Sequence, residues 1–129
     1  MKRNKTKTLR NKCDATWSRV TKLIHVAVNG PICLWCRKKG LVLQSDHIIN
    51  RWKTATRWSP SNCVVLCLPC HLFRKKREPL AWAEMVKENI REETLNELKI
   101  SSQEICKPNY EQILGFLTQV EESLKDLKK

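Results

Sequence analysis

Two Cys-x-x-Cys pairs, Cys33 with Cys36 and Cys67 with Cys70, are separated by thirty residues of the chain. Each pair can supply two thiolates from one tight turn, and four thiolates are a common ligand set of structural zinc. Four thiolates fill the coordination shell of zinc, so that no position remains for water or substrate. The sequence therefore predicts a structural Zn2+ ion at these four cysteines, and any catalysis must come from other residues.

A second group of polar residues, Asp46, His47, Asn62 and His71, lies between the cysteine pairs and directly after them. Hydrolysis of a phosphodiester needs a base that activates water and a cation that neutralises charge on the phosphate. His47 is the candidate base, because a neutral imidazole is available near pH 7. Asp46 and His71 can hold a divalent ion. Asn62 can hold the ion too, or hydrogen-bond the loop that carries His47.

The segments around these residues are expected to form two strands followed by a helix. The first strand covers residues 41–47 and ends with the Asp-His pair, and residues 63–66 are β-branched and apolar enough for the second strand. Residues 48–61 form the loop between the strands. A helix that starts near Leu68 places His71 in its first turn, so that the second cysteine pair brings His71 close to the end of the first strand.

The residues before the first cysteine pair divide into an arm and a helix. Residues 1–12 hold six Lys or Arg and one Leu. Such a segment buries too little apolar surface to order itself, so a mobile arm is expected. Residues 14–29 repeat apolar positions at helical spacing, with Asp14 as the N-cap. Residues 13–77 are therefore expected to form one folded unit, a helix followed by the zinc-bound strands and helix.

Residues 78–129 are expected to form a C-terminal helical extension. A long helix begins at Pro79, residues 100–107 break it, and a last helix runs from Pro108 to the end. Apolar residues follow one side of the last helix at heptad spacing: Ile113, Leu117, Val120, Leu124 and Leu127. This stripe either packs against residues 80–98 as a helical hairpin or forms the seam of a homodimer.

Positive charge is concentrated in the part of the chain that holds the cysteine pairs. Residues 1–77 contain 18 Lys or Arg and two acidic residues, a balance of +16, whereas residues 78–129 contain 7 Lys or Arg and 11 acidic residues, a balance of −4. A basic half points to a polyanion, most simply nucleic acid, and solubility alone is the alternative. The candidate DNA-binding residues are Arg51, Lys53, Arg57, Arg74, Lys75, Lys76 and Arg77.

The pattern of these motifs resembles the HNH endonuclease family. The resemblance depends on Asp-His-Ile at 46–48, on Asn62 and on the segment LCLPCH at 66–71, and it covers residues 33–77. It implies a ββα-metal fold. It also implies cleavage of DNA with Mg2+ or Mn2+ that leaves a 5′-phosphate and a 3′-hydroxyl.

The roles of the family can be carried over one residue at a time. His47 matches the general base, Asp46 and His71 match the metal ligands, and Asn62 matches the Asn in the middle of the motif. The sequence departs from the family in two places. The loop before the Asn lacks the Gly-Gly that is frequent in the family. The position four residues after the last His, which is often a His or Lys in the family, is Lys75. Neither departure removes a catalytic group.

The loop sequence ATRWSPSN at 55–62 is similar to the loop of phage recombination endonucleases of the NinG or Rap type. That similarity implies cutting of branched DNA during DNA recombination. Two tryptophans of the loop, Trp52 and Trp58, either stack on unpaired bases at a branch or pack the loop onto its domain.

Taken together, these patterns predict an α+β protein with a zinc-stapled ββα core, an N-terminal helix and a C-terminal helical extension. They favour a metal-dependent DNA endonuclease over the alternative, a zinc-ribbon DNA-binding module without catalysis. No run approaches the roughly 18 to 20 apolar residues of a membrane span, and no apolar signal region follows the basic N-terminus. An intracellular, cytoplasmic location in a bacterium or a phage-infected host is therefore expected. In that reducing compartment, seven cysteines favour metal over disulfides.

Overall fold

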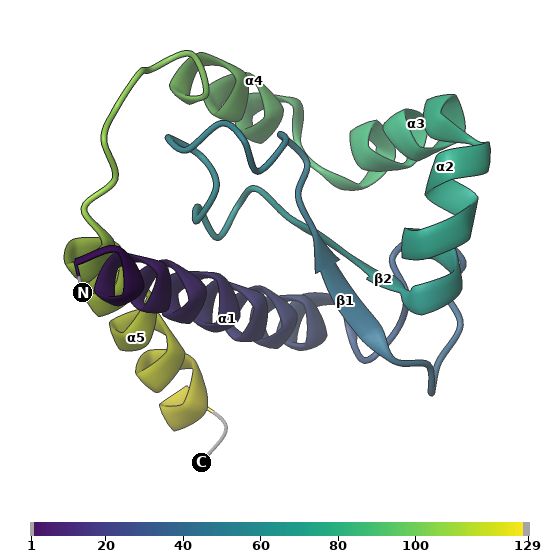
Figure 1. Ribbon diagram of the computed structural model, residues 1–129. Coiled ribbons are helices and arrows are strands. Elements are labelled where there is room, and N and C mark those ends of the chain that lie inside the picture. Colours follow the sequence, from purple (N-terminus) through teal and green to yellow (C-terminus); the bar gives the residue numbers. More distant parts are fainter. Residues whose placement is uncertain (1, 128–129) are drawn as a thin grey trace.

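The structure is a computed structural model that describes residues 2–127, with side chains from residue 4 to residue 127. One short two-stranded antiparallel sheet lies among helices (Figure 1). In chain order the elements are α1 (Lys2–Asn29), β1 (Leu43–Asp46), β2 (Val64–Cys67), η1 (Cys70–Arg74), α2 (Lys75–Arg77), α3 (Pro79–Asn89), α4 (Glu92–Ser101) and α5 (Tyr110–Leu127). No helix within residues 2–127 combines the length and the apolar character needed to cross a membrane.

The two faces of β1 meet different helices, because successive side chains of a strand point to opposite faces. Its four residues pair with the four residues of β2 in antiparallel register. Ser45 faces α1, where its hydroxyl lies 2.6 Å from the hydroxyl of Thr21. Gln44 and Asp46 face the helix after β2, where both contact the imidazole of His71. The sheet therefore separates α1 from the helix that carries His71.

The helix after β2 begins where the strand ends, as the sequence predicts. Leu68 and Pro69 are already helical, and η1 follows as a π-helical turn in which the Lys75 N–H donates to the Cys70 carbonyl. π-helical turns occur often at functional sites, and this one contains His71. The predicted order of strand, loop, strand and helix is confirmed for these elements.

The first helix is longer than the sequence predicts. A helix over residues 14–29 with a mobile arm before it is expected, but α1 begins at Lys2. Lys and Arg are good helix formers, and neither Gly nor Pro interrupts residues 2–29, so the basic segment extends the helix by three turns. Asp14 consequently lies inside α1 and is not its N-cap. Met1 lies outside the described residues.

The predicted long helix after Pro79 is wrong, because the chain turns between α3 and α4. Ile90 and Arg91 adopt extended backbone angles, and the Asn89 amide donates to the Met85 carbonyl at 2.8 Å in the last turn of α3. Successive residues of a straight helix are rotated by about 100°, so Met85, Ile90 and Leu95 would point in three directions. The turn lets all three side chains reach one hydrophobic core.

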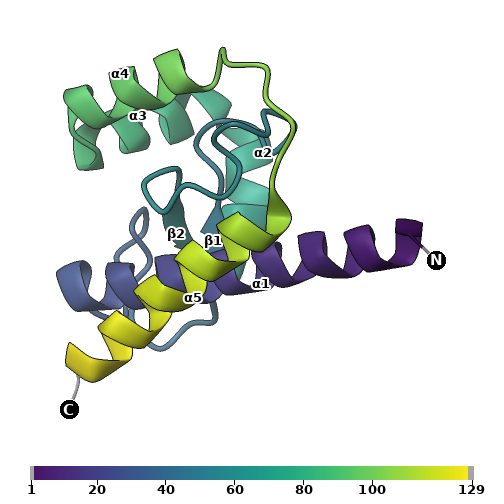
Figure 2. The same ribbon diagram turned by 90° about the vertical axis from the view of Figure 1, so that its left-hand side faces the viewer.

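The last helix packs against α1 and not against α3 or α4 (Figures 1 and 2). Leu117 is fully buried in a cluster with Trp17 of α1. Beside it, the Arg19 guanidinium donates to the Glu121 carboxylate at 2.8 Å. The predicted hairpin with residues 80–98 is therefore wrong, since α1 covers the centre of the stripe. Leu127 at the end of the stripe is exposed, and the homodimer stays a prediction.

Candidate metal centre and active site

Four cysteine thiols lie together at the end of the sheet where β1 begins and β2 ends. The Sγ atoms of Cys33, Cys36, Cys67 and Cys70 all lie within 4.8 Å of one another. The first pair lies in a turn before β1, which closes because the Cys33 carbonyl accepts the Arg37 N–H at 2.9 Å and Arg37 takes a φ of 64°. The second pair lies where β2 ends and η1 begins. The predicted ligand set is thus brought together, and it could hold a structural metal ion such as zinc.

The thiols of Cys33 and Cys70 differ in acidity. Burial opposes ionisation of Cys33, but hydrogen bonds from nearby backbone N–H groups outweigh burial and lower its pKa from 9.0 to about 7. Burial and the neighbouring Cys67 thiol raise the pKa of Cys70 to about 12. Protein groups alone therefore favour the thiolate at Cys33 and oppose it at Cys67 and Cys70. A divalent cation is the partner that would stabilise the remaining negative charges.

A separate open pocket of about 420 Å³ lies between α1, the end of β1 and the helix after β2. It is lined by Asp14, Trp17, Ser18, Ser45, Asp46, His47, Asn50, Arg51, His71 and Lys75. Three of the four residues predicted to act in hydrolysis therefore share one pocket: Asp46, His47 and His71. Asn62, the fourth, does not line the pocket.

The carboxylate of Asp46 is buried and oriented by its neighbours. Its Oδ2 accepts a hydrogen bond from Nε1 of Trp82 at 3.1 Å. Its Oδ1 lies 2.9 Å from Nζ of Lys75 and 3.5 Å from Nε2 of His71. Because Trp82 engages one oxygen, the other is directed towards the imidazole and the ammonium group.

The imidazole of His71 is held in one tautomer by Gln44. Nδ1 of His71 lies 2.8 Å from Oε1 of Gln44, which only accepts hydrogen bonds, so Nδ1 carries the proton. In the neutral imidazole, Nε2 then has the lone pair, and it lies 3.5 Å from Oδ1 of Asp46. A carboxylate oxygen and an imidazole nitrogen at this distance are two donors that could hold a divalent cation, with further positions left for water and phosphate. Lys75 would compete with such a cation for the same carboxylate oxygen.

The imidazole of His47 is positioned from two sides. Its Nε2 donates to the Arg57 carbonyl at 2.8 Å, which leaves Nδ1 as the atom that can accept a proton. Its ring is stacked on the indole of Trp17, with ring centroids 4.0 Å apart and planes 7° apart. Burial lowers the pKa of His47 below its ordinary value of 6.5, although the Arg57 carbonyl and Asp46 oppose this shift. His47 is therefore neutral at pH 7 and able to act as a base.

Asn62 hydrogen-bonds the loop and does not reach the pocket, so the structure favours the second of the two roles considered for it. Its side chain is completely buried. Its Oδ1 accepts the Ile49 N–H at 2.7 Å, and its Nδ2 donates to the carbonyls of Ile49 and Thr56 at 3.1 and 3.0 Å. These bonds tie Asn62, which follows the loop, to Ile49 near the start of the loop and to Thr56 in its middle. Asn62 is thus placed to position the base and not to bind the ion.

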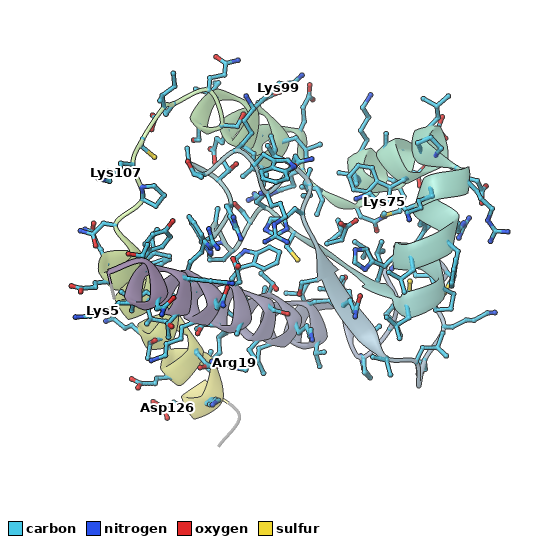
Figure 3. The ribbon with its side chains drawn as sticks, viewed as in Figure 1. Lys5, Arg19, Lys75, Lys99, Lys107 and Asp126 are labelled. Carbon is cyan, nitrogen blue, oxygen red and sulfur yellow. The ribbon has the colours of Figure 1, made fainter. Side chains whose placement is uncertain are left out.

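The basic residues predicted to bind DNA differ in their exposure to solvent. Arg51, Lys53, Lys76 and Arg77 are exposed, whereas Arg74 and Lys75 are partly buried. Figure 3 shows that the cations are widely spread, with Lys5 near the N-terminal end of α1 and Lys75 on the helix after β2.

The structure does not support the prediction that Arg57 binds DNA. Its guanidinium is buried and donates twice to the Asp14 carboxylate, at 3.1 and 2.8 Å. Trp58 also donates to Asp14, at 2.8 Å, so that one carboxylate of α1 fixes the loop. The carbonyl of Arg57 contributes to the site directly, because it accepts the hydrogen bond from Nε2 of His47.

Four residues of the site were not predicted from the sequence: Asp14, Trp17, Gln44 and Trp82. Each acts through another residue, by stacking, by a hydrogen bond or by an ion pair. Gln44 lies two positions before Asp46 on β1, and the alternation of a strand could have placed both on one face. The other three come from helices far along the chain, and no local pattern marks them.

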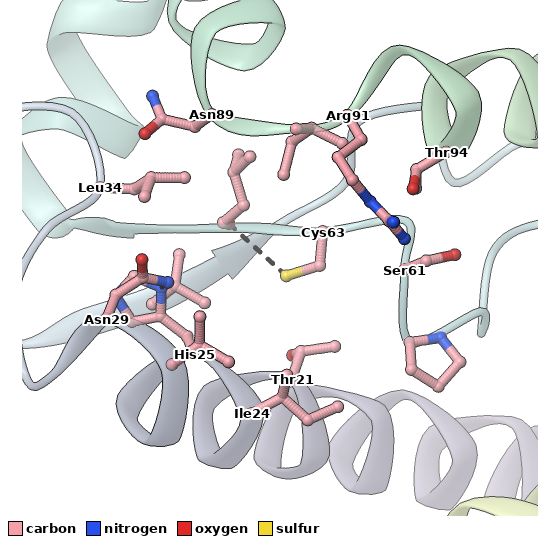
Figure 4. Close-up of a pocket in the computed structure, with 15 residues that line it drawn as sticks. Thr21, Ile24, His25, Asn29, Leu34, Ser61, Cys63, Asn89, Arg91 and Thr94 are labelled. Carbon is pink, nitrogen blue, oxygen red and sulfur yellow. Dashed lines mark hydrogen bonds between the residues drawn. The ribbon is translucent and has the colours of Figure 1, made fainter.

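A second cavity, of about 280 Å³, lies on the other side of β2 between α1 and the turn from α3 to α4 (Figure 4). Cys63 points into it, and its thiol donates to the Val64 carbonyl. Burial raises the pKa of Cys63 to about 11, so this thiol is not a nucleophile at neutral pH. None of the residues predicted to act in hydrolysis lines this cavity.

Comparison of the chain with protein-family models, with curated proteins and with solved structures finds no match.

Proposed function

We propose that the protein is a metal-dependent endonuclease that hydrolyses phosphodiester bonds of DNA in the pocket of Asp46, His47 and His71. One observation carries this proposal. A neutral imidazole with an available Nδ1 shares a pocket with a carboxylate oxygen and an imidazole nitrogen that lie 3.5 Å apart. A base beside a two-donor cation site is the minimum that water-driven cleavage of a phosphodiester needs.

Each residue of the pocket would have its own role in the reaction. Nδ1 of His47 takes a proton from water, the water oxygen bonds to phosphorus, and the bond from phosphorus to the 3′-oxygen breaks. The leaving oxygen gains a proton from solvent, so the products are a 5′-phosphate and a 3′-hydroxyl. Asp46 and His71 are the residues that would hold Mg2+ or Mn2+. A cation bound there would neutralise charge on the phosphate and on the leaving oxygen.

The surrounding fold supports the same proposal. Membership of the HNH family would require two antiparallel strands, a loop between them and a helix, with the base at the end of the first strand. The chain has these elements in this order, and the four thiols lie together where the helix start meets the turn before β1. Zinc at the thiols would stabilise the scaffold and take no part in hydrolysis, because four thiolates leave it no open position.

The charge distribution supports nucleic acid as the substrate. Arg51 lines the pocket, and Lys53, Lys76 and Arg77 are exposed around the same strands and helix. The balance of +16 over residues 1–77 favours a polyanion. The similarity of the loop to phage recombination endonucleases extends the proposal to branched DNA.

One contact favours the alternative, a zinc-bound DNA-binding module without catalysis. Nζ of Lys75 lies 2.9 Å from Oδ1 of Asp46, where it supplies the positive charge that a divalent ion would supply. If Lys75 is never displaced, the pocket binds no metal. The endonuclease remains the better account, because a module that only binds DNA does not need a partly buried, stacked imidazole beside Asp46.

The test is a cleavage assay with purified protein. Duplex, single-stranded, flap and four-way DNA, together with an RNA duplex, are incubated with Mg2+ or Mn2+. The expected result is DNA cleavage that depends on added metal and that is lost in Asp46→Asn and His71→Ala. The matched control is Glu84→Gln, an exposed acid of α3. Binding of every DNA without cleavage in either metal would overturn the proposal and support the binding module, and cleavage of RNA alone would overturn the choice of substrate.

A further inference from the structure

Trp52 and Trp58 lie in the same loop but have opposite environments. The Trp58 side chain is 5% exposed, its Nε1 donates to Asp14 at 2.8 Å, and its ring meets Tyr110 edge-on. Trp52 is 82% exposed. Trp58 therefore packs the loop onto the domain, and Trp52 has no part in that packing.

The backbone beneath Trp52 is held in a defined turn. Oδ1 of Asn50 accepts the Trp52 N–H at 2.9 Å, and the carbonyl of Asn50 accepts the Lys53 N–H at 2.9 Å. Oγ1 of Thr54 then donates to the Cys106 carbonyl at 3.3 Å, which ties the loop to the segment between α4 and α5. A ring presented on a fixed turn loses little conformational freedom when it binds a flat partner.

Trp52 also adjoins the candidate active site. Asn50 and Arg51, the two residues before it, line the pocket together with His47. Exposed cations flank it on both sides, Arg51 and Lys53, and residues 47–59 contain no acidic residue. Cations that contact phosphates and an aromatic ring that stacks on a base are the combination with which proteins bind single-stranded nucleic acid.

We propose that Trp52 stacks on an unpaired base next to the phosphodiester that enters the pocket, and that it thereby selects unpaired or branched DNA. This inference rests on the proposed function, whose substrate preference it assigns to one residue. Bases of an intact duplex are stacked on both faces, so the indole can reach one only after a step is unstacked. A base at a bulge, flap or junction is already exposed, and its stacking on Trp52 needs no such opening.

The experiment measures binding without added Mg2+ or Mn2+, so that it does not depend on cleavage. An intact duplex is compared with a duplex that carries one unpaired 2-aminopurine. The wild-type protein should prefer the bulged duplex and quench the fluorescence of the 2-aminopurine. Trp52→Ala should reduce the ratio of the two affinities by about tenfold and abolish the quenching, since stacking on one aromatic side chain has about this effect. Trp52→Phe should retain most of both effects.

The matched control is Leu80→Ala on α3, because Leu80 is 81% exposed and lies outside the loop. It should keep the wild-type ratio. A Trp52→Ala variant with the wild-type preference and quenching, or a wild-type protein with no preference, would overturn the inference even if the protein cuts DNA. A wild-type protein that cuts no DNA but loses its preference with Trp52→Ala would overturn the proposed hydrolysis and support the stacking.

Discussion

The indole of Trp17 lies parallel to the imidazole of His47, with ring centroids 4.0 Å apart. Trp17 belongs to α1 and His47 follows β1, so this contact fixes the first helix against the candidate base. We expect the contact to hold Nδ1 of His47 in position for water, since a displacement of about 1 Å can lower the rate of an enzymatic reaction about 100-fold.

Two substitutions of Trp17 separate stacking from the other contact of this side chain. Nε1 of Trp17 donates to the Ser59 carbonyl at 2.8 Å, and both Trp17→Phe and Trp17→Leu lose that bond. Only Phe keeps a ring that can stack. The prediction is a kcat about tenfold or more higher for Trp17→Phe than for Trp17→Leu, at similar melting temperatures. Equal kcat values in the two variants would show that stacking does not position His47.

The pH dependence of cleavage should report the low pKa of His47. Burial lowers that pKa below 6.5, and only the neutral imidazole can accept a proton from water. The cleavage rate at saturating metal should therefore rise with pH through a value below 6.5 and then level off. The rate is measured from pH 5 to pH 8 in both Mg2+ and Mn2+, because metal binding by Asp46 and His71 also titrates. A half-maximal rate above pH 6.5 in both metals would argue against His47 as the base.

Removal of the ammonium group of Lys75 should strengthen metal binding at Asp46. Lys75→Met should lower the Kd for Mn2+ by up to about fivefold, because a partly exposed ion pair is worth at most about 1 kcal/mol. The neighbouring residue provides the control: Lys76 is exposed, and Lys76→Met should leave the Kd unchanged. Titration calorimetry without DNA measures both values. Weaker Mn2+ binding in Lys75→Met would mean that Lys75 supports the cation and does not compete with it.

A metal ion bound by the four cysteines should stabilise the fold. Cys67→Ser should lose bound zinc and unfold the strands and the following helix, because structural zinc contributes on the order of 10 kcal/mol to the folding of small domains. Cys106→Ser is the control, since Cys106 is exposed and lies outside the cluster. Elemental analysis and circular dichroism provide the readouts. Purified wild-type protein that contains no metal and is nevertheless folded would contradict this assignment.

The sequence predicts the parts of the site that are close together along the chain. The spacing of the cysteines identifies a cluster that could hold a metal ion, and the Asp-His pair before the loop identifies one end of a strand. The helix that starts at Leu68 then places His71 opposite that strand end. These inferences need only local geometry, and the structure brings Asp46, His47 and His71 into one pocket.

Contacts between distant segments were not predictable in this way. Trp17 stacks on His47 across thirty positions of the chain, and Trp82 reaches Asp46 across 36. The sequence suggests that the side chain of Arg57 binds phosphate, but its guanidinium forms an ion pair with the Asp14 carboxylate. The heptad stripe of α5 shows that a partner exists, and only tertiary packing decides that the partner is α1.

The most direct test of the proposed endonuclease is the single-turnover rate of DNA cleavage by His47→Ala, measured with saturating protein and Mg2+ or Mn2+. The account predicts a rate about 100- to 10,000-fold below that of the wild type, as expected when a general base is removed. Zinc content and DNA affinity should stay close to the wild-type values, because His47 acts on water and not on the scaffold. A wild-type rate in this variant would show that His47 is not the base and would contradict the account.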